Sequence, residues 1–463
     1  MLSQNETLSN NKETNKCEEC GELYEGFLNI KYKWCKPCQI NRLKNYIQFS
    51  GDEKIDEFIQ EINSKITCYN DSLFEWIPYN RFDDIALIGK GGFSMVYSAI
   101  WKNGRLYYDV DKKEWTTRKE RANKKVALKC LLDSQNITNE FLNEIKIHSM
   151  MKSRHNLKVY GISQNPDTKE YIMVFEFVEG GSLNDWINKN FNNLNWKNKL
   201  KSLYNIFNAL DELHQRGFVH HDFHTGNILI KNVNWPYISD MGLCREASNI
   251  DETKIFGVIP YLSPEVLKGN PYTQAADIYS AGMIMYVIAT GRQPFANRAH
   301  DEYLVINICK GDRPEINELE APKCYIDLMK NCWDSNPDKR PKIAELKTDI
   351  LKFYSSYTKK ASEFKTLMKA EKGHEHYEIE KQFKEAEEHR KSLTSESTTH
   401  SQAIYTSRLL NSFTNNIPKY DNVDNNTVEI IDFTKKSGVL IVIGQSIRIM
   451  LILMDRYFLL AVK

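Results

Sequence analysis

The sequence lacks an excess of charge of either sign, since 62 Lys and Arg residues oppose 61 Asp and Glu residues over 463 positions. No global electrostatic field therefore indicates nucleic acid or a membrane surface as a partner. Residues 1–16 lack an apolar core, so they do not have the pattern of a secretory signal peptide. Their polar, Asn-rich composition predicts disorder.

The sequence also lacks the cysteine pattern of a disulfide framework. Of the ten cysteines, four form two Cys-x-x-Cys pairs and the others are scattered. This usage is typical of a protein from a reducing compartment that carries one metal site. We therefore expect a cytoplasmic location, with the nucleus as the alternative.

The two cysteine pairs have the spacing of a zinc-binding module. Cys17 and Cys20 form the first pair, and fourteen residues separate it from the pair Cys35 and Cys38. Each pair places two thiolates within reach of one cation, and two pairs complete a tetrahedral four-sulfur site. We predict structural Zn²⁺ in a zinc-ribbon-like module at 17–38; four free thiols in a loop are the alternative interpretation.

Basic and aromatic residues surround the second cysteine pair. They suit either a protein partner, such as a ubiquitin-like domain, or nucleic acid, whereas the simpler interpretation is a solvated face. These residues are Lys31, Tyr32, Trp34, Lys33, Lys36, Arg42 and Lys44. The next segment, residues 39–81, has apolar residues at helical spacing and predicts a helical linker.

Three polar side chains mark the centre of the chain. Asp222 and Asn227 lie five residues apart in a polar loop, and two short apolar runs after them predict a hairpin that ends at Asp240. One carboxylate in such a corner is able to accept a proton from a hydroxyl. The other carboxylate and the amide offer the oxygen ligands that Mg²⁺ prefers.

This stretch resembles the catalytic loop and the metal-binding motif of eukaryotic protein kinases. The two motifs stand here as His220-His221-Asp222 with Asn227, and as Asp240-Met241-Gly242. A single match of this kind is weak evidence, so the interpretation depends on the other motifs of the family.

Further kinase-like motifs occur earlier in the chain, in the order of the family. A glycine-rich turn at 88–97 lets backbone N–H groups approach phosphates, although Ser94 replaces the third glycine of the family. Lys129 ends the run Val-Ala-Leu-Lys, and Glu144 follows fifteen residues later in a helical pattern. Residues 171–183 resemble the hinge that binds adenine, with Phe175 behind the pocket. Between the first two motifs, residues 100–125 predict an exposed, charged hairpin.

Later motifs complete the resemblance. Glu265 lies in a segment that resembles the end of the activation loop, Asp277 starts a helix that braces the catalytic loop in the family, and Arg340 matches the late arginine that pairs with the glutamate. Eight motifs in order predict an α+β, two-lobed kinase fold at 82–354. The small lobe should hold an antiparallel sheet and one helix, the large lobe should be mainly helical, and the zinc ribbon precedes both.

The resemblance implies a protein kinase that transfers the γ-phosphate of Mg-ATP to a protein hydroxyl, in signalling. It implies that Lys129, held by Glu144, orients the phosphates, that Asp222 is the catalytic base, and that Asn227 and Asp240 hold Mg²⁺. The residues that it places against the nucleotide are Ile88, Gly89, Gly91, Gly92, Val96, Ala127, Lys129, Glu176 and Val178.

Four further positions, besides Ser94, depart from the family pattern. His221 replaces the arginine that meets an activation-loop phosphate, so regulation by loop phosphorylation is in question. His224 and Val258 replace the lysine and threonine that mark Ser/Thr kinases, but the segment that ends at Glu265 lacks the tryptophan form of tyrosine kinases. Ser/Thr specificity is therefore favoured. Met241 preserves an apolar side chain where the family has phenylalanine.

Three alternatives remain open from the sequence. The first is a pseudokinase scaffold that recruits partners through the zinc ribbon and the tail. The second is a tyrosine or dual-specificity kinase. In the third, the ribbon binds nucleic acid and the kinase activity is secondary. Residues 355–437 are first charged and then rich in Ser, Thr and Asn, and they predict a solvated helix or loose linker. Residues 438–463 are apolar but interrupted by charges. They predict a segment that docks on protein or stays loose, with a membrane span as the less favoured interpretation.

Overall fold

The computed structural model describes residues 15–71, 73–92, 94–117, 122–131, 138–151, 156–232, 235–246, 254–358, 373–390 and 399–414. Residues 1–14 and the apolar tail at 438–463 lie outside these ranges, so the predictions made for them stay predictions. In the described part of the chain, no helix is long and apolar enough to cross a membrane.

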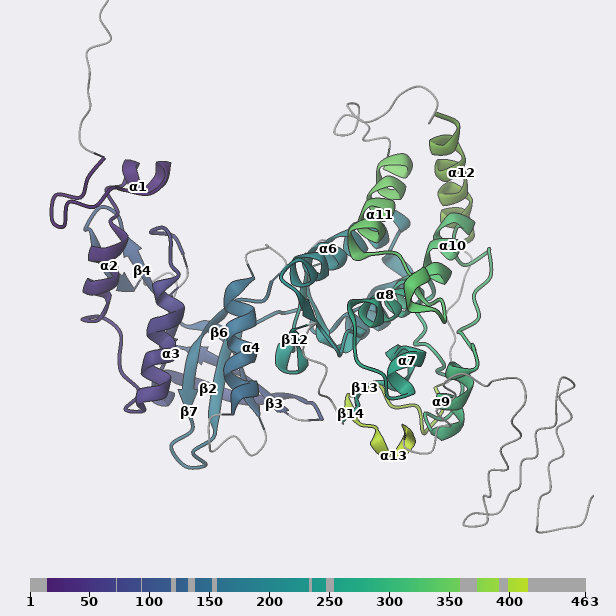
Figure 1. Cartoon of the computed structure of the whole chain (residues 1–463), viewed down its shortest axis with the longest axis horizontal. Coiled ribbons are helices and arrows are strands. Elements are labelled where there is room, and N and C mark those ends of the chain that lie inside the picture. The colour runs from purple at the N-terminus through teal and green to yellow at the C-terminus, as the bar shows by residue number, and fades with distance from the viewer. Residues whose placement is uncertain are drawn as a thin grey trace, which may run out of the picture. The chain divides into compact units, whose positions relative to one another are not determined.

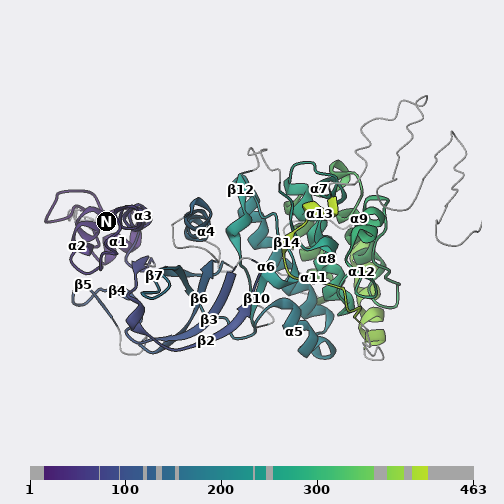
Figure 2. The same cartoon turned by 90° about the horizontal axis from the view of Figure 1, so that it is seen from below.

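A six-stranded sheet forms the small lobe (Figures 1 and 2). All neighbouring strands pair antiparallel, except that the short β1 pairs parallel with β7. In sheet order the strands are β1 (Glu75–Trp76), β7 (Val159–Gln164), β8 (Tyr171–Glu176), β6 (Lys124–Leu131), β3 (Ser94–Trp101) and β2 (Phe82–Lys90).

The two faces of this sheet pack into separate cores. Along β8, Tyr171, Met173 and Phe175 point to one face, while Ile172 and Val174 point to the other, as the two-residue period of a strand requires. Two helices cover the first face: α4 (Asn139–Met150), as expected, and α3 (Glu53–Ser64). The second helix belongs to the segment predicted as a linker. Its apolar stripe, Ile55, Phe58, Ile59 and Ile62, is buried against the sheet, so this part of the segment is structurally part of the small lobe.

The charged hairpin at 100–125 is not simply exposed, which corrects the prediction. Its strands β4 (Leu106–Asp109) and β5 (Glu114–Thr117) bring Tyr108 and Trp115 to one face, and both side chains are buried. They pack with Trp34 and Leu43 of the N-terminal module, which also contains α1 (Phe27–Lys31) and α2 (Lys36–Leu43), and with Ile66 and Leu73, which follow α3 in the chain. Charge dominated the composition of the hairpin, but Tyr108 and Trp115 decided where it packs.

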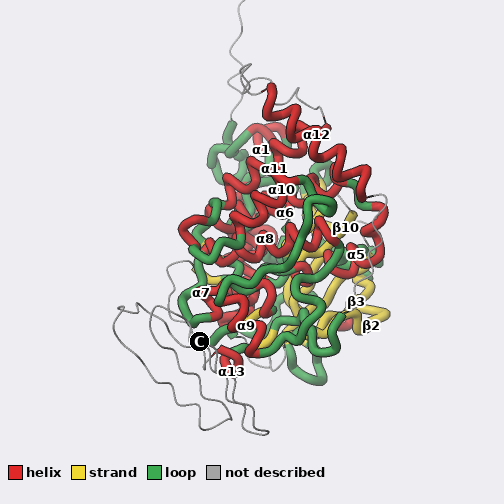
Figure 3. The backbone as a smooth tube through the Cα atoms, turned by 90° about the vertical axis from the view of Figure 1, so that its right-hand side faces the viewer, coloured by secondary structure: helices red, strands yellow, loops and turns green. Residues whose placement is uncertain are grey.

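The large lobe is mainly helical, as predicted (Figure 3). Its central helix, α8, is buried along almost its whole length, which is typical of a helix that is apolar on all sides. The helices are α5 (Leu183–Asn190), α6 (Trp196–Gln215), α7 (Pro264–Leu267), α8 (Gln274–Thr290), α9 (Glu302–Cys309), α10 (Lys323–Cys332), α11 (Ile343–Thr358), α12 (Gly373–Arg390) and α13 (Asn411–Thr414). Three short strand pairs complete it: β9 (Phe218–Val219) with β12 (Arg245–Glu246), β10 (Ile228–Asn232) with β11 (Trp235–Ile238), and β13 (Phe256–Gly257) with β14 (Arg408–Leu409).

Helix α12 lies beside α10 and α11 (Figure 1), within the segment predicted as a solvated helix or loose linker. Ile379, Phe383 and Ala386 are buried on one face of it. The Phe383 ring contacts the rings of Trp196 and Phe353 at centroid distances of 5.4 and 5.6 Å. A narrow apolar stripe among many charges is therefore enough to dock the helix, and the fully buried Phe383 is its largest member.

We predict that Phe383→Ala lowers the free energy of unfolding by about 3–5 kcal/mol, because it removes a fully buried aromatic side chain and leaves a cavity. Thermal or denaturant unfolding measures the change. Tyr377→Ala is the matched control, since Tyr377 lies on the same helix and is exposed, and it should change stability by less than about 0.5 kcal/mol. Equal effects of the two variants would show that α12 is not docked.

Candidate active site

A cleft of about 940 Å³ is lined by residues of the small lobe, the large lobe and the C-terminal segment. Its walls include seven of the nine residues predicted for nucleotide binding: Ile88, Gly89, Gly91, Gly92, Val96, Lys129 and Val178. Ala127 and Glu176 do not line it, and the Glu176 carboxylate forms an ion pair of 2.9 Å with Lys231 instead. Leu229, which was not among the predicted residues, also lines the cleft. Its place in an apolar run two residues after Asn227 was the available signal.

Lys129 joins the two predicted carboxylates on the small-lobe side of this cleft. Its Nζ atom lies 2.6 Å from Oε1 of Glu144 and 2.7 Å from Oδ1 of Asp240. Lys129 is buried. Burial by itself would lower the pKa of the lysine, but the carboxylates of Asp240 and Glu144 more than offset it and raise the pKa above its ordinary value. The lysine is therefore a fixed positive charge inside the cleft.

The hairpin β10–β11 positions the other polar groups, as the sequence predicted. Ile228 pairs with Ile238, and the Ser239 amide donates to the carbonyl of Asn227 at 2.9 Å. Asp240 follows in the left-handed region, with φ 58°. Such a conformation is costly for a residue with a Cβ atom and occurs often at functional sites. It turns Asp240 toward Lys129.

Asp277, the first acidic residue of α8, holds the backbone of the loop that carries Asp222. Its carboxylate accepts the backbone N–H groups of His220 and His221 at 2.8 and 3.2 Å. His214 contacts the same carboxylate at 2.8 Å. The bracing role that the resemblance assigned to the start of this helix therefore agrees with the contacts.

The late ion pair that the resemblance implied is present. Arg340 donates to both oxygens of Glu265, at 2.6 and 2.8 Å. Such a bidentate pair fixes direction as well as distance. It ties α7, which begins after Ser263 at the end of the activation segment, to the segment before α11.

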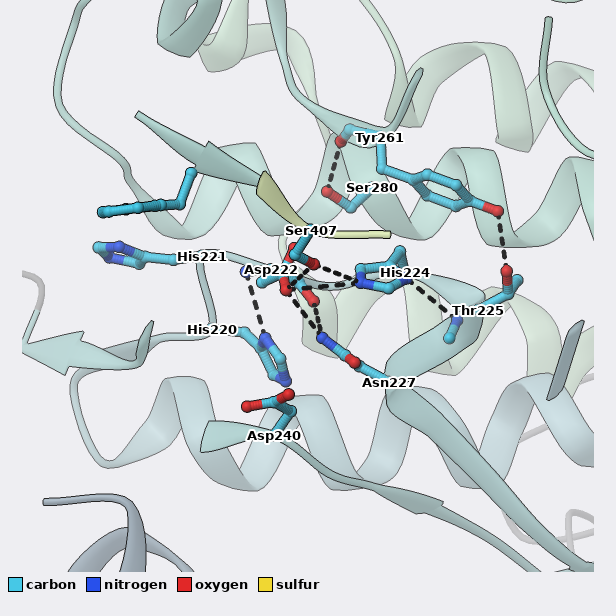
Figure 4. A network of polar contacts seen from close by, with 12 residues as sticks. His220, His221, Asp222, His224, Thr225, Asn227, Asp240, Tyr261, Ser280 and Ser407 are labelled. Atoms are coloured by element: carbon cyan, nitrogen blue, oxygen red, sulfur yellow. Dashed lines mark hydrogen bonds and ion pairs between the residues drawn. The ribbon is translucent and has the colours of Figure 1, made fainter. Parts of the chain in front are cut away.

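Asp222 lies on the large-lobe side of the cleft (Figure 4). The Asn227 side-chain amide donates to its Oδ2 atom at 2.9 Å and to its carbonyl at 3.0 Å. Burial alone would raise the pKa of this carboxyl, but the electrostatic influence of His224 and the hydroxyl of Ser407 lower the pKa to about 2. Asp222 is therefore a carboxylate at neutral pH, which is the form that accepts a proton.

The two histidines that depart from the family pattern differ in direction. His221 stacks on the ring of Tyr272, with 4.4 Å between the ring centroids and 6° between the planes, and Figure 4 shows it pointing away from Asp222. His224 instead turns to Asp222, and its Nε2 atom lies 3.4 Å from Oδ2. The histidine that replaces the family's lysine is thus at the Asp222 carboxylate, and the one that replaces the arginine is not.

We predict a stability change with pH that arises from His148, which is buried beside Phe175. Burial, followed by the positive charge of Lys129, lowers the pKa of His148 to about 4. Because the unfolded chain binds this proton below about pH 6.5 while the folded chain does not, folding loses stability as pH falls from 6.5 toward 4. The full loss is about 3 kcal/mol for a shift of this size.

Denaturant unfolding at pH 7 and pH 4.5 gives the stability that each protein loses on acidification. The contribution of His148 is the difference between this loss in wild type and in His148→Gln. The amide is neutral at both pH values, so the variant should lose less stability than wild type on acidification. Parallel losses in the two proteins would contradict the assignment.

The four N-terminal cysteines converge as the spacing predicted. Their Sγ atoms all lie within 4.8 Å of one another, with 3.7 Å between Cys17 and Cys38 and 3.3 Å between Cys20 and Cys35. Sulfur atoms around a tetrahedral zinc lie about 3.8 Å apart, given Zn–S bonds of about 2.3 Å. The donor set and its size therefore fit one Zn²⁺ ion, with each sulfur as one ligand.

The family model for protein tyrosine and serine/threonine kinases matches residues 83–350. Among curated proteins, one of Dictyostelium discoideum named "Probable LIM domain-containing serine/threonine-protein kinase" is 28% identical over 333 residues, which cover 70% of this chain and 49% of that protein. An Arabidopsis thaliana protein named "Protein kinase and PP2C-like domain-containing protein" is 26% identical over 308 residues, which cover 59% and 44%.

The chain thus spans about half the length of these relatives, or less. The family model, however, covers more than half of this chain and contains every motif from the glycine-rich turn to Arg340. The geometry of Lys129, Glu144, Asp240 and Asp222 agrees with that match. This chain belongs to the protein tyrosine and serine/threonine kinase family.

Proposed function

We propose that this chain is a serine/threonine protein kinase, which transfers the γ-phosphate of ATP to a hydroxyl of a protein in signalling. The observation that carries the proposal is the position of Lys129. It contacts both Glu144 and Asp240 across the same cleft that Asp222 and Asn227 line. Phosphoryl transfer depends on alignment and on neutralised charge, and these groups supply both.

Each residue has a proposed role in this reaction. Lys129 orients the phosphates, Glu144 holds the lysine, and Asp222 accepts the proton of the acceptor hydroxyl. Asn227 and Asp240 offer the oxygen atoms that would hold Mg²⁺. When bound, the metal neutralises charge on the phosphates.

The predicted nucleotide contacts remain part of the proposal. Seven of the nine line the cleft, and the glycine-rich turn is closed by a hydrogen bond of 2.8 Å from Gly91 N–H to the Ser94 carbonyl. Ala127 and Glu176 would contribute by positioning residues that line the cleft. Ala127 pairs with Phe175 in the sheet, and Glu176 lies two residues before Val178.

Two features support an active kinase over a pseudokinase. All five catalytic candidates are present, and His224 places a polar ring beside Asp222 where the family has lysine. The names of the relatives support serine and threonine over tyrosine. Regulation by phosphorylation of the activation loop is not supported by His221, whose ring stacks on Tyr272.

The N-terminal module is proposed as a structural zinc site that presents a surface to a protein partner. Two of its basic residues are already paired with acidic ones: Lys33 with Glu18 and Arg42 with Glu19. This pairing reduces the positive charge available for phosphates and favours a protein partner over nucleic acid. The cytoplasmic or nuclear location remains a proposal that rests on the cysteine usage.

The test is transfer of labelled phosphate from Mg-ATP to a generic protein, followed by identification of the modified amino acids. We expect phosphoserine and phosphothreonine. Phosphotyrosine as the main product would overturn the hydroxyl class, and no transfer by well-folded protein would favour the pseudokinase.

A further inference from the structure

A C-terminal strap, residues 399–414, runs along the large lobe, where β14 lies beside β13 and α13 lies near α9 (Figure 1). Tyr405, Thr406 and Ser407 of this strap line the cleft. Its strand β14 pairs antiparallel with β13, so that Leu409 lies opposite Phe256 and Arg408 opposite Gly257. The Leu410 amide donates to the carbonyl of Ile255 at 2.8 Å, and the Leu410 side chain is fully buried. The strap is thus added as a strand beside the end of the activation segment.

Contacts on both sides of β14 hold the strap in register. Before it, the Tyr405 hydroxyl donates to the carbonyl of Pro294 at 3.0 Å. Within it, the Arg408 guanidinium donates to the carbonyl of His300 at 2.8 Å. After it, the Asn411 side chain accepts the Ile255 amide at 2.9 Å. Main-chain pairing sets the position of the strap, and these side chains set which residue faces the cleft.

The residue that faces the catalytic base is Ser407 (Figure 4). Its hydroxyl lies 2.5 Å from Oδ2 of Asp222 and 3.1 Å from Nε2 of His224. The Gly226 amide donates to Nδ1 of His224 at 3.0 Å, so the ring proton of His224 is on Nε2. His224 therefore donates to Ser407, and Ser407 donates to Asp222.

The backbone of Ser407 also touches the glycine-rich turn. A Cβ atom added to Gly92 would lie 2.1 Å from the carbonyl oxygen of Ser407, so only glycine fits there. Ser407 is consequently enclosed between the turn that is proposed to cover the phosphates and the carboxylate that is proposed to accept the proton. A reacting hydroxyl must lie within about 3 Å of its base, and Ser407 does.

We propose that Ser407 is a phosphorylation site that this chain modifies in itself; the inference rests on the proposed kinase function. Asp222 takes the hydroxyl proton of Ser407. The Ser407 oxygen forms a bond to the γ-phosphorus of ATP, and the bond from that phosphorus to the bridging oxygen breaks. Its electron pair leaves with ADP. The acceptor is a serine in an extended segment, with Tyr405 and Thr406 before it and Arg408 after it.

The product state changes the contacts of the strap. A phosphate on Ser407 carries a charge of about −2 at neutral pH, and it would lie beside the Asp222 carboxylate. Like charges at this distance repel, so the phosphorylated strap leaves the cleft. Until then Tyr405, Thr406 and Ser407 of the strap line the cleft, so the strap stands between Asp222 and any other protein hydroxyl.

The experiment incubates the full chain with Mg-ATP at protein concentrations that differ 100-fold, and mass spectrometry maps the phosphates over time. We expect Ser407 to be modified with a rate constant that does not change with concentration, because donor and acceptor belong to one chain. A generic protein is present as a second acceptor. Ser407→Ala should abolish the strap phosphate, while Ser401→Ala, an exposed serine of the same strap, should leave it unchanged.

The outcomes separate this inference from the proposed function. Transfer to the generic protein with an unmodified Ser407 would overturn the inference and leave the kinase standing. A rate constant that rises with concentration would overturn modification within one chain. No transfer to either acceptor would overturn both.

Amide hydrogen exchange without nucleotide gives a readout that does not depend on activity. In the unmodified chain the Leu410 amide should be protected by its bond to Ile255, and Ser407→Glu should speed its exchange at least about tenfold. Ser401→Glu is the charge-matched control and should change nothing. An unprotected Leu410 amide in wild type would show that the strap is not paired with β13 and would overturn the proposal.

Discussion

Asp222→Asn should lower the rate of phosphate transfer to a generic protein by about 10² to 10⁴, the range typical of general base catalysis. The amide has nearly the same shape as the carboxylate and keeps a hydrogen-bond acceptor for Asn227, but it does not take a proton. The pKa of Asp222, which is about 2, means that the wild-type group is fully ionised at the pH of the assay. The loss should therefore appear in kcat at every pH from 6 to 8.

Two controls show that the loss is chemical. The shift in melting temperature that Mg-ATP causes should be similar in wild type and Asp222→Asn, since Lys129 and the glycine-rich turn are unchanged. Asp327→Asn removes an exposed carboxylate of α10 that pairs with Lys323, and it should leave the rate within about twofold. A rate for Asp222→Asn close to wild type would remove the proposed base.

Metal analysis of purified chain should find one Zn²⁺ per molecule, and Cys35→Ser should abolish it. Cys35 is buried and contributes one of four sulfurs, and a hydroxyl does not replace a thiolate as a zinc ligand. Structural zinc sites contribute on the order of 10 kcal/mol to folding. Residues 17–43 should therefore lose their protection from hydrogen exchange in the variant.

Cys68→Ser is the matched control, because Cys68 lies next to the module but its thiol donates to Asn70 rather than to the cluster. It should keep the zinc and the protection. The loss in Cys35→Ser should also loosen the β4–β5 hairpin, since Tyr108 and Trp115 pack on Trp34 of the module. Zinc retained by Cys35→Ser, or none in wild type, would contradict the site.

Autophosphorylation at Ser407 would connect the active site to the C-terminal segment. The strap is both the proposed substrate and an occupant of the cleft, so the first turnover would open the cleft to other protein substrates. The contacts of Ser407 agree with this order of events: its hydroxyl meets Asp222 and His224, and its carbonyl packs on Gly92.

The amino-acid sequence was sufficient where the chemistry is local along the chain. Asp222 and Asn227 lie five residues apart, Asp240 ends a short hairpin, and each cysteine pair is a four-residue unit. Spacing at this scale determines geometry, because a turn or a hairpin allows few conformations. The zinc cluster and the hairpin were therefore predictable with their residues, and the ordered motifs implied the two-lobed fold.

Tertiary structure alone decided the contacts between distant segments. Lys129 and Asp240 are 111 residues apart, and Ser407 and Asp222 are 185 apart. The family resemblance placed the first two residues at one site without predicting their direct contact, and nothing in the sequence predicted the second contact. The strap is rich in polar residues and lacks a periodic pattern of apolar residues. Its position depends on a short strand pairing and on the burial of Leu410, and only the folded large lobe provides the partners for both. The same holds for α12, whose position follows from the contacts of Phe383 with Trp196 of α6 and Phe353 of α11.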